Sequence, residues 1–331
     1  MIKTALVTGG AGFIGSHMVD FLLSKNYIVK VLDNFSGGQD QNLVHHKNNG
    51  KLIVEKTDIR DCEKIKTFFK DINEVYHFAG IGDIVPSIEN PIEYFSVNAS
   101  GTAILMDCLR NSKNLKKIVY AASSSCYGLA STPTDEHHKI QPEYPYALSK
   151  YQGEMIVRHW YKVYKIPVNT IRIFNAYGPR VRTTGAYGAV FGVFFKQKLS
   201  NAPLTIVGDG EQTRDFLYVT DVAKAFFMAA QTKLTNEVWN LGAGNPVSIN
   251  YLADLIGYKS KKYIPKRPAE PDCTWANIKK ISKDLNWKVE VNFEEGVKTM
   301  LKNINYWQDA PLWTEKKIQT ATKTWFKYLK N

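Results

Sequence analysis

Cysteine is scarce in this chain of 331 residues, and its four cysteines show no paired spacing. They are Cys62, Cys108, Cys126 and Cys273. This pattern argues against a disulfide framework and against a zinc site, and it is typical of a protein of the reducing cytoplasm. The adjacent pairs His45-His46 and His137-His138 have no further ligands near them in the sequence, so we interpret them as surface pairs and expect no metal centre.

Long apolar runs are also missing. The longest, Ala189 to Phe195, is far too short to cross a bilayer, and the first predicted strand begins where a signal peptide would have to be. We therefore expect a cytoplasmic protein with no membrane partner.

Acidic residues are fewer than basic ones, 31 against 43, which gives a net charge of +12. The lysines are scattered over several predicted helices and form no stripe interleaved with aromatic residues. This distribution favours an anionic small molecule, and not nucleic acid, as the partner.

A glycine-rich turn near the N-terminus is the first positive signal. The apolar run from Ile2 to Val7 predicts a buried parallel strand, and a helical pattern opens at Phe13 and Ile14. Between them stand three regularly spaced glycines, Gly9, Gly12 and Gly15. Glycine lets backbone amides approach a diphosphate closely, and the helix N-terminus adds free amides and the positive end of its dipole. The turn therefore predicts a dinucleotide site.

Asp33 strengthens this prediction. It ends a second predicted strand, Ile28 to Leu32, about twenty residues past the last glycine, as the dinucleotide fingerprint requires. A carboxylate there accepts a hydrogen bond from a ribose 2′-hydroxyl and repels a 2′-phosphate, so NAD is favoured over NADP. The alternative is that Asp33 is a turn residue before Asn34 and Ser36.

Predicted strands and helices alternate along most of the chain, which is typical of a doubly wound parallel sheet. We predict an α/β fold: a Rossmann-type NAD-binding domain over residues 1–175 and 215–241, and a smaller α/β C-terminal lobe over 176–214 and 242–331. Long helices are predicted over 91–110 and 146–164, and a loop with room for a short helix over 35–50.

Tyr146 and Lys150 are four residues apart and share one face of a predicted helix. A nearby ammonium stabilises a phenolate, which can remove a hydroxyl proton as hydride leaves the same carbon. Such a pair is also common on helix surfaces. The serine run that begins at Ser123 favours the catalytic interpretation, because it closes the fifth predicted strand, where ligands of open α/β sheets bind.

Together these residues resemble the extended short-chain dehydrogenase/reductases that act on nucleotide sugars, the NAD-dependent epimerases and dehydratases. The resemblance covers nearly the whole chain. Its motifs are Thr8 to Gly15, Asp58, His77 to Gly80, Asn98, the serine run, Tyr146 with Lys150, Asn175 and Arg214-Asp215-Phe216. It implies a homodimer that packs helices 91–110 and 146–164 into a four-helix bundle, and a role in polysaccharide biosynthesis.

The resemblance also implies roles for individual residues. Tyr146 is the expected base, Lys150 lowers its pKa and holds the nicotinamide ribose, and Ser123, with Ser124 as the alternative, aligns the sugar hydroxyl. NAD is the expected cofactor, and its expected contacts are Gly9, Gly12, Phe13, Ile14, Gly15, Asp33, Asn34, Ser36, Asp58, Ile59, Phe78, Ala79, Gly80, Asn98, Tyr146 and Lys150.

The nucleotide-diphosphate sugar is expected to bind the second lobe. Arg214 suits a phosphate because of its planar fork. The expected substrate contacts are Ser87, Asn175, Val190, Thr205, Arg214, Arg267 and Asp272. For Arg180, Arg182 and Lys266, a solvated surface position is an equal alternative.

Two departures from the family limit the reaction. Ser124 and Ser125 stand where sugar 4,6-dehydratases have an Asp-Glu pair, so dehydration is disfavoured, and so is decarboxylation. Oxidation of a ring hydroxyl at C4 remains, in a nucleotide-sugar 4-epimerase or, alternatively, in a C4 dehydrogenase that releases a 4-keto sugar, for example from a GDP-linked heptose or hexose. The segments Gly82–Ser87 and Thr183–Gly188 differ from ordinary UDP-galactose epimerases and keep this alternative open. A regulator that binds NAD without turnover is a third hypothesis, which Ser123, Tyr146 and Lys150 oppose.

Overall fold

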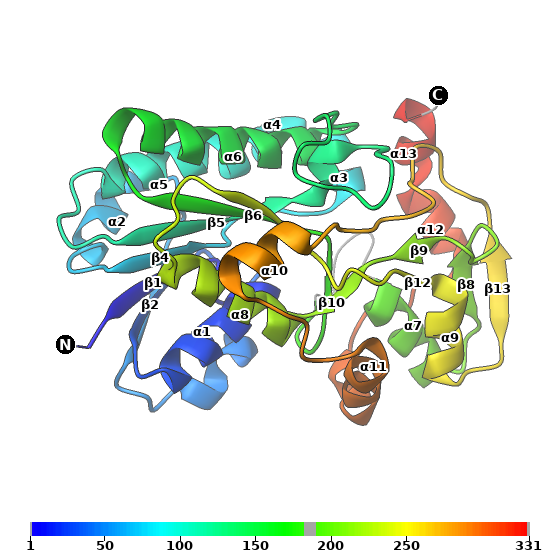
Figure 1. The fold of residues 1–331 in the computed structure, drawn as a ribbon. Helices are drawn as coiled ribbons and strands as arrows, with labels where there is room; N and C mark the ends of the chain where they lie inside the picture. The colour runs from blue at the N-terminus through cyan, green and yellow to red at the C-terminus, as the bar shows by residue number, and fades with distance from the viewer. Residues whose placement is uncertain (1, 182–189, 330–331) are drawn as a thin grey trace.

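The computed structural model describes residues 2–181 and 190–329. Within them lies a seven-stranded sheet in which every neighbouring pair is parallel, in the order β11-β6-β5-β4-β1-β2-β3 (Figure 1). Its strands are β1 (Thr4–Thr8), β2 (Ile28–Asp33), β3 (Leu52–Lys56), β4 (Glu74–His77), β5 (Lys117–Ser123), β6 (Val168–Ile173) and β11 (Val238–Leu241). The chain order reverses beside β1, between β2 and β4. The predicted doubly wound fold is confirmed, and its ligand crevice is expected at this reversal.

Helices cover both faces of the sheet (Figure 1). One face packs against α2 (Cys62–Phe68), α5 (Thr102–Leu109) and α6 (Pro145–Tyr164), and the other against α1 (Phe13–Ser24), α8 (Val219–Gln231) and α10 (Lys279–Leu285). Successive strand residues serve opposite faces. In β1, Val7 lies in the core with α1 and α8, whereas Leu6 lies in the core with α5 and α6.

A second lobe is built around short strand pairs and an aromatic core that includes Tyr177, Phe191 and Trp307. The pairs are β7 (Asn175–Tyr177) with β10 (Phe216–Tyr218), β9 (Thr213–Arg214) with β12 (Val247–Ser248), and β8 (Leu204–Val207) with β13 (Lys261–Ile264). The helices around them are α7 (Val190–Leu199), α9 (Ile249–Ile256), α11 (Phe293–Lys302) and η5 (Ile304–Trp307). Ile281 and Trp287, which fall within the predicted lobe over 242–331, pack instead in the core of the large sheet.

Several local predictions need correction. The predicted helix over 91–110 forms as α4 (Pro91–Phe95), a π-helical stretch η3 (Ser96–Gly101) and α5. Helix α3 (Ile84–Glu89) begins within the segment from Gly82 to Ser87. The prediction of a loop over 35–50 with room for a short helix is confirmed, since the loop holds two short 3₁₀ helices, η1 (Asp40–Asn42) and η2 (Val44–His46). A third 3₁₀ helix, η4 (Ser124–Tyr127), follows β5. Two C-terminal helices, α12 (Glu315–Ala321) and α13 (Lys323–Tyr328), were not predicted.

The cysteine prediction was wrong for one pair. Cys62 begins α2 and Cys108 lies near the end of α5, and the two are joined by a disulfide with a Cα–Cα distance of 6.6 Å. They are 46 residues apart in the sequence and meet because α2 packs against α5, which no local spacing shows. Within the described ranges, no helix is long and apolar enough to cross a membrane.

Candidate active site

A cavity of about 1070 Å³ lies between the carboxyl ends of the sheet strands and the second lobe. Its walls come from the glycine turn after β1, the ends of β2, β4, β5 and β6, and the elements α3, α6, α7, β8 and β9. A concave site of this size at a strand-order reversal is the expected place for a ligand.

The glycine turn forms one end of the cavity. Gly9 has φ +69°, and a Cβ there would lie 2.7 Å from the backbone nitrogen of Ala79. A Cβ on Gly15 would lie 2.1 Å from the Gly9 carbonyl oxygen. Helix α1 begins after Gly12, its N-cap residue. Glycine has no side chain, so Gly12 provides no side-chain acceptor for the amides of the first helical turn. These amides border the cavity, as a diphosphate site requires.

Asp33 lies at the end of β2 and lines the cavity. Its Oδ2 accepts a hydrogen bond from the Ala11 amide at 2.9 Å and its Oδ1 accepts one from the Phe35 amide at 2.8 Å. Burial raises the pKa of Asp33, and the two amides oppose that rise. Each carboxylate oxygen keeps a further lone pair with which it can accept a ribose hydroxyl.

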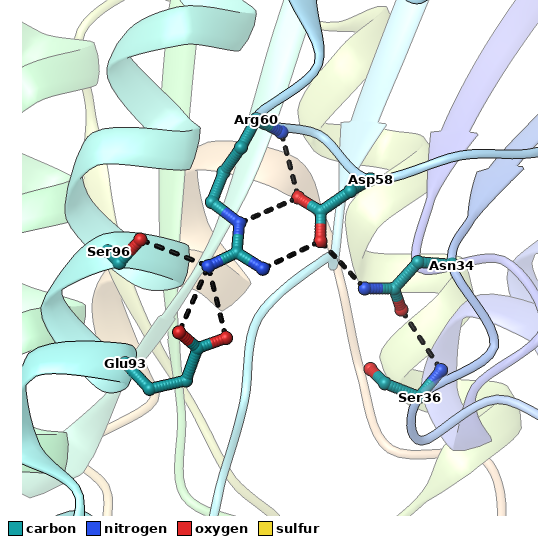
Figure 2. A network of polar contacts seen from close by, with 6 residues as sticks. All are labelled: Asn34, Ser36, Asp58, Arg60, Glu93 and Ser96. Carbon is teal, nitrogen blue, oxygen red and sulfur yellow. Dashed lines mark hydrogen bonds and ion pairs between the residues drawn. The ribbon is translucent and has the colours of Figure 1, made fainter.

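Beside Asp33, a polar network fixes the next stretch of the wall (Figure 2). The Asn34 amide donates to Asp58 Oδ2 at 2.9 Å, and Arg60 binds Asp58 and Glu93 at the same time. The hydrogen bonds from Arg60 lower the pKa of Asp58 to about 2. Arg60 also lines the cavity, and the sequence analysis missed it. Because two carboxylates engage its guanidinium, Arg60 is poorly placed to neutralise a 2′-phosphate.

The residues predicted to transfer the proton also line this cavity. Tyr146 and Lys150 on α6 and Ser123 at the end of β5 all line the cavity. Burial raises the pKa of Tyr146, and a hydrogen bond with the Ser123 hydroxyl opposes that rise. Burial lowers the pKa of Lys150 to about 8, and its Nζ lies 4.6 Å from the centre of the Tyr120 ring. Ser124 is not part of the wall.

Other predicted cofactor residues fall into two groups. Those at the cavity wall are Gly9, Gly12, Phe13, Ile14, Gly15, Asn34, Ser36, Asp58, Ile59, Phe78, Ala79 and Gly80. Asn98 lies behind the wall: its Oδ1 accepts from the Ile81 amide at 2.9 Å, and its Nδ2 donates to Ser149 Oγ at 2.9 Å. It therefore positions the backbone at Gly80 and Ile81.

In the second lobe, five of the seven predicted substrate residues line the same cavity: Asn175, Val190, Thr205, Arg214 and Arg267. Ser87 does not, because it is fully buried and donates to the Ile84 carbonyl within its own helix. The Asp272 side chain is 75% exposed and pairs with Lys266.

Glu270 is the carboxylate that reaches the cavity from this segment, and the sequence analysis missed it. Its Oε1 pairs with Arg214 Nη2 at 3.0 Å. Glu270 stands three residues after Arg267, a predicted substrate contact. This short separation was the sequence feature from which Glu270 could have been predicted as a cavity residue. Gln212, Phe216 and Trp325 also line the wall and were not predicted.

His45 and His46 have a neighbour that the sequence analysis did not expect. Both Nε2 atoms lie 2.8 Å from Asp20 Oδ1, and the Arg180 guanidinium pairs with Asp20 Oδ2 at 2.8 Å. Arg180 Nη2 is also 3.4 Å from His45 Nε2. The group of Asp20, His45 and His46 therefore already has a positively charged side chain beside it. Arg180 is thus an ion-pair residue outside the cavity, whereas Arg182 and the segment Thr183–Gly188 lie outside the described residues.

Comparison with known proteins places the chain among the nucleotide-sugar epimerases and dehydratases. The GDP-mannose 4,6 dehydratase family matches residues 6–300. A putative UDP-glucose 4-epimerase of Methanocaldococcus jannaschii is 40% identical over 313 residues, which are 91% of this chain and 99% of that protein. The structure of a UDP-N-acetylglucosamine 4-epimerase from Methanobrevibacter ruminantium in complex with UDP-N-acetylmuramic acid superposes with a TM-score of 0.86 at 31% identity, over 91% of this chain and 97% of that one. A Bacillus cereus UDP-glucuronic acid 4-epimerase in complex with UDP-glucuronic acid and NAD gives 0.83 at 33% identity, over 92% and 99%.

Proposed function

This chain belongs to the extended short-chain dehydrogenase/reductase family of NAD-dependent nucleotide-sugar epimerases and dehydratases, and from that premise we propose that it is a nucleotide-sugar 4-epimerase. It is an NAD-dependent enzyme, and the glycine turn and Asp33 fit the cofactor, because both line the cavity and a Cβ at Gly9 or Gly15 would collide with the backbone that forms this wall. One observation supports the reaction most: Ser123, Tyr146 and Lys150 lie in one cavity with Arg214 and Arg267.

The chemistry follows from these residues. NAD held by the glycine turn and Asp33 would supply a reversible hydride acceptor for C4 of the sugar. Tyr146 takes the C4 hydroxyl proton and gives it back, and the Ser123 hydroxyl holds the sugar hydroxyl in line with the phenol. The Lys150 ammonium favours the phenolate form of Tyr146 and so opposes the effect of burial. If the 4-keto sugar rotates in the site so that its opposite face receives the hydride, the configuration at C4 is inverted.

Dehydration is less well supported, although the matching family is described as a dehydratase. The serines at 124 and 125 supply no carboxylate beside Ser123, and Ser125 instead accepts a hydrogen bond from the Ser123 hydroxyl at 3.0 Å. Elimination of water from the sugar needs a separate acid and base.

The test uses purified protein with a panel of UDP-, GDP- and dTDP-sugars, following absorbance of reduced nicotinamide and the C4 configuration of the products by NMR. A C4 epimer without net NADH supports the proposal and identifies the nucleobase of the substrate. Accumulating NADH with a 4-keto product would instead establish a C4 dehydrogenase, and NAD binding with no conversion of any sugar would favour a regulator.

We further propose a homodimer. Exposed apolar side chains lie on α4 and α6, where Ile92 is 79% exposed, Met155 54% and Val163 50%. Packing these two helices against a second copy would remove this apolar surface from water.

A further inference from the structure

The C-terminal segment of residues 315–328 lies beyond residue 300, where the family match ends, at one side of the molecule (Figure 1). It is attached at two places. Glu315, at the start of α12, pairs with Lys262 of β13 at 2.5 Å. Thr324 of α13 donates to Glu89 of α3 at 2.8 Å. The segment therefore joins the second lobe to a helix beside the large sheet.

Trp325 is the residue of this segment that reaches the main cavity. Its side chain is buried, and its Nε1 donates to the Pro268 carbonyl at 2.7 Å. The guanidinium carbon of Arg267 lies 5.4 Å from the centre of the indole ring. The ring is thus hydrogen-bonded to the same loop that carries the arginine with which it makes a cation–π contact.

Arg267 and Arg214 flank one carboxylate at the cavity wall. Arg267 Nη1 lies 3.5 Å from Glu270 Oε2, and Arg214 Nη2 lies 3.0 Å from Glu270 Oε1. A guanidinium that stacks on an aromatic face loses little of its hydrogen-bonding capacity, because its N–H groups lie in its own plane. Stacking also restricts the rotamers of the long arginine side chain, so less freedom is lost when an anion binds.

We infer that Trp325 is a positioning residue for the substrate: it holds the Arg267 guanidinium for the diphosphate of the nucleotide sugar, so that affinity depends on a segment outside the family match. This inference rests on the proposed function, since it takes a nucleoside diphosphate as the ligand. Trp325 acts through Arg267 and takes no part in proton or hydride transfer.

The experiment measures binding of UDP, GDP and dTDP to the NAD-loaded protein by calorimetry, for wild type, Trp325→Ala and Trp325→Phe. Loss of the ring should weaken binding of the preferred diphosphate roughly 2- to 10-fold, the range expected when one long side chain must be ordered on binding. Trp325→Phe, which keeps a ring, should recover most of the affinity. Tyr328→Ala is the matched control, because it removes an exposed aromatic side chain from the same helix.

A double-mutant cycle separates positioning from general packing. In an Arg267→Met background, Trp325→Ala should cause no further loss of diphosphate affinity, while NAD affinity stays unchanged in every variant. An equal loss in both backgrounds, or a loss no larger than that of Tyr328→Ala, would overturn the inference and leave the proposed function intact. Failure of the wild type to bind any of the three diphosphates while it binds NAD would overturn the proposed function, and this inference with it.

Discussion

Arg60 binds Asp58 through two parallel hydrogen bonds, 2.9 Å from Nε to Oδ1 and 2.8 Å from Nη2 to Oδ2 (Figure 2). The third nitrogen of the guanidinium, Nη1, faces Glu93 at 3.0 Å and 3.1 Å. The positive charge of Arg60 is therefore already balanced by two carboxylates. Asp33 repels a phosphate on the ribose 2′-oxygen, and Arg60, already paired with Asp58 and Glu93, is poorly placed to neutralise it. Both features therefore favour NAD over NADP.

Asp33→Asn should weaken NAD binding about tenfold, because a hydrogen bond to a charged acceptor contributes about 1.5–3 kcal/mol and the amide keeps only part of it. The ratio of NADP to NAD dissociation constants should fall as the repulsive charge is lost. Calorimetric titration of both dinucleotides measures this, with Asp40→Asn, on the neighbouring loop, as control. An unchanged ratio would mean that Asp33 is only a turn residue.

The features that sequence predicted well are local. The spacing of Gly9, Gly12 and Gly15 determines a turn geometry within a few residues, and the four-residue spacing of Tyr146 and Lys150 places both on one helix face. The structure accordingly brings all five to the same cavity. The sheet followed from the alternation of apolar strands and amphipathic helices, which is a property of short windows.

The features that sequence missed depend on how distant segments pack. Cys62 meets Cys108 only because two helices are neighbours. Asp272 and Glu270 are two residues apart, yet only Glu270 reaches the cavity, because the path of the loop decides which carboxylate points inward. Trp325 reaches the wall from the far end of the chain. No local pattern carries this information.

Tyr146→Phe should lower kcat by at least a hundredfold, the usual loss when a general base is removed, and leave NAD affinity within about twofold. Tyr144→Phe is a matched control, because its ring stacks on Tyr146 with an interplanar angle of 8° yet does not line the cavity. The control should keep most of its activity. Initial rates of sugar conversion and calorimetry with NAD give the two readouts, and an active Tyr146→Phe enzyme would exclude this mechanism.

Lys150→Met should abolish turnover and yet stabilise the fold at pH 7. The pKa of Lys150 is lowered to about 8 by burial, from an ordinary value of 10.5, so the unfolded state binds the proton more tightly. Below pH 8 the buried ammonium therefore costs stability, about 2–4 kcal/mol when converted at 1.36 kcal/mol per pKa unit. Between pH 8 and 10.5 this cost declines as the folded protein releases the proton. Urea unfolding of both proteins from pH 7 to 10.5 should show the stability gap closing, and a gap independent of pH would contradict the prediction.

Met155→Asp should convert the protein to monomers if α4 and α6 form the dimer interface. Met155 is 54% exposed in the single chain, so a carboxylate there costs an isolated monomer little. In an interface of packed helices the same charge would be buried without a partner, which opposes association strongly. Light scattering coupled to size-exclusion chromatography measures the mass, with Tyr263→Asp, at an exposed position on β13 of the second lobe, as control. A wild type of monomeric mass, or a Met155→Asp variant that stays dimeric, would remove these helices as the interface.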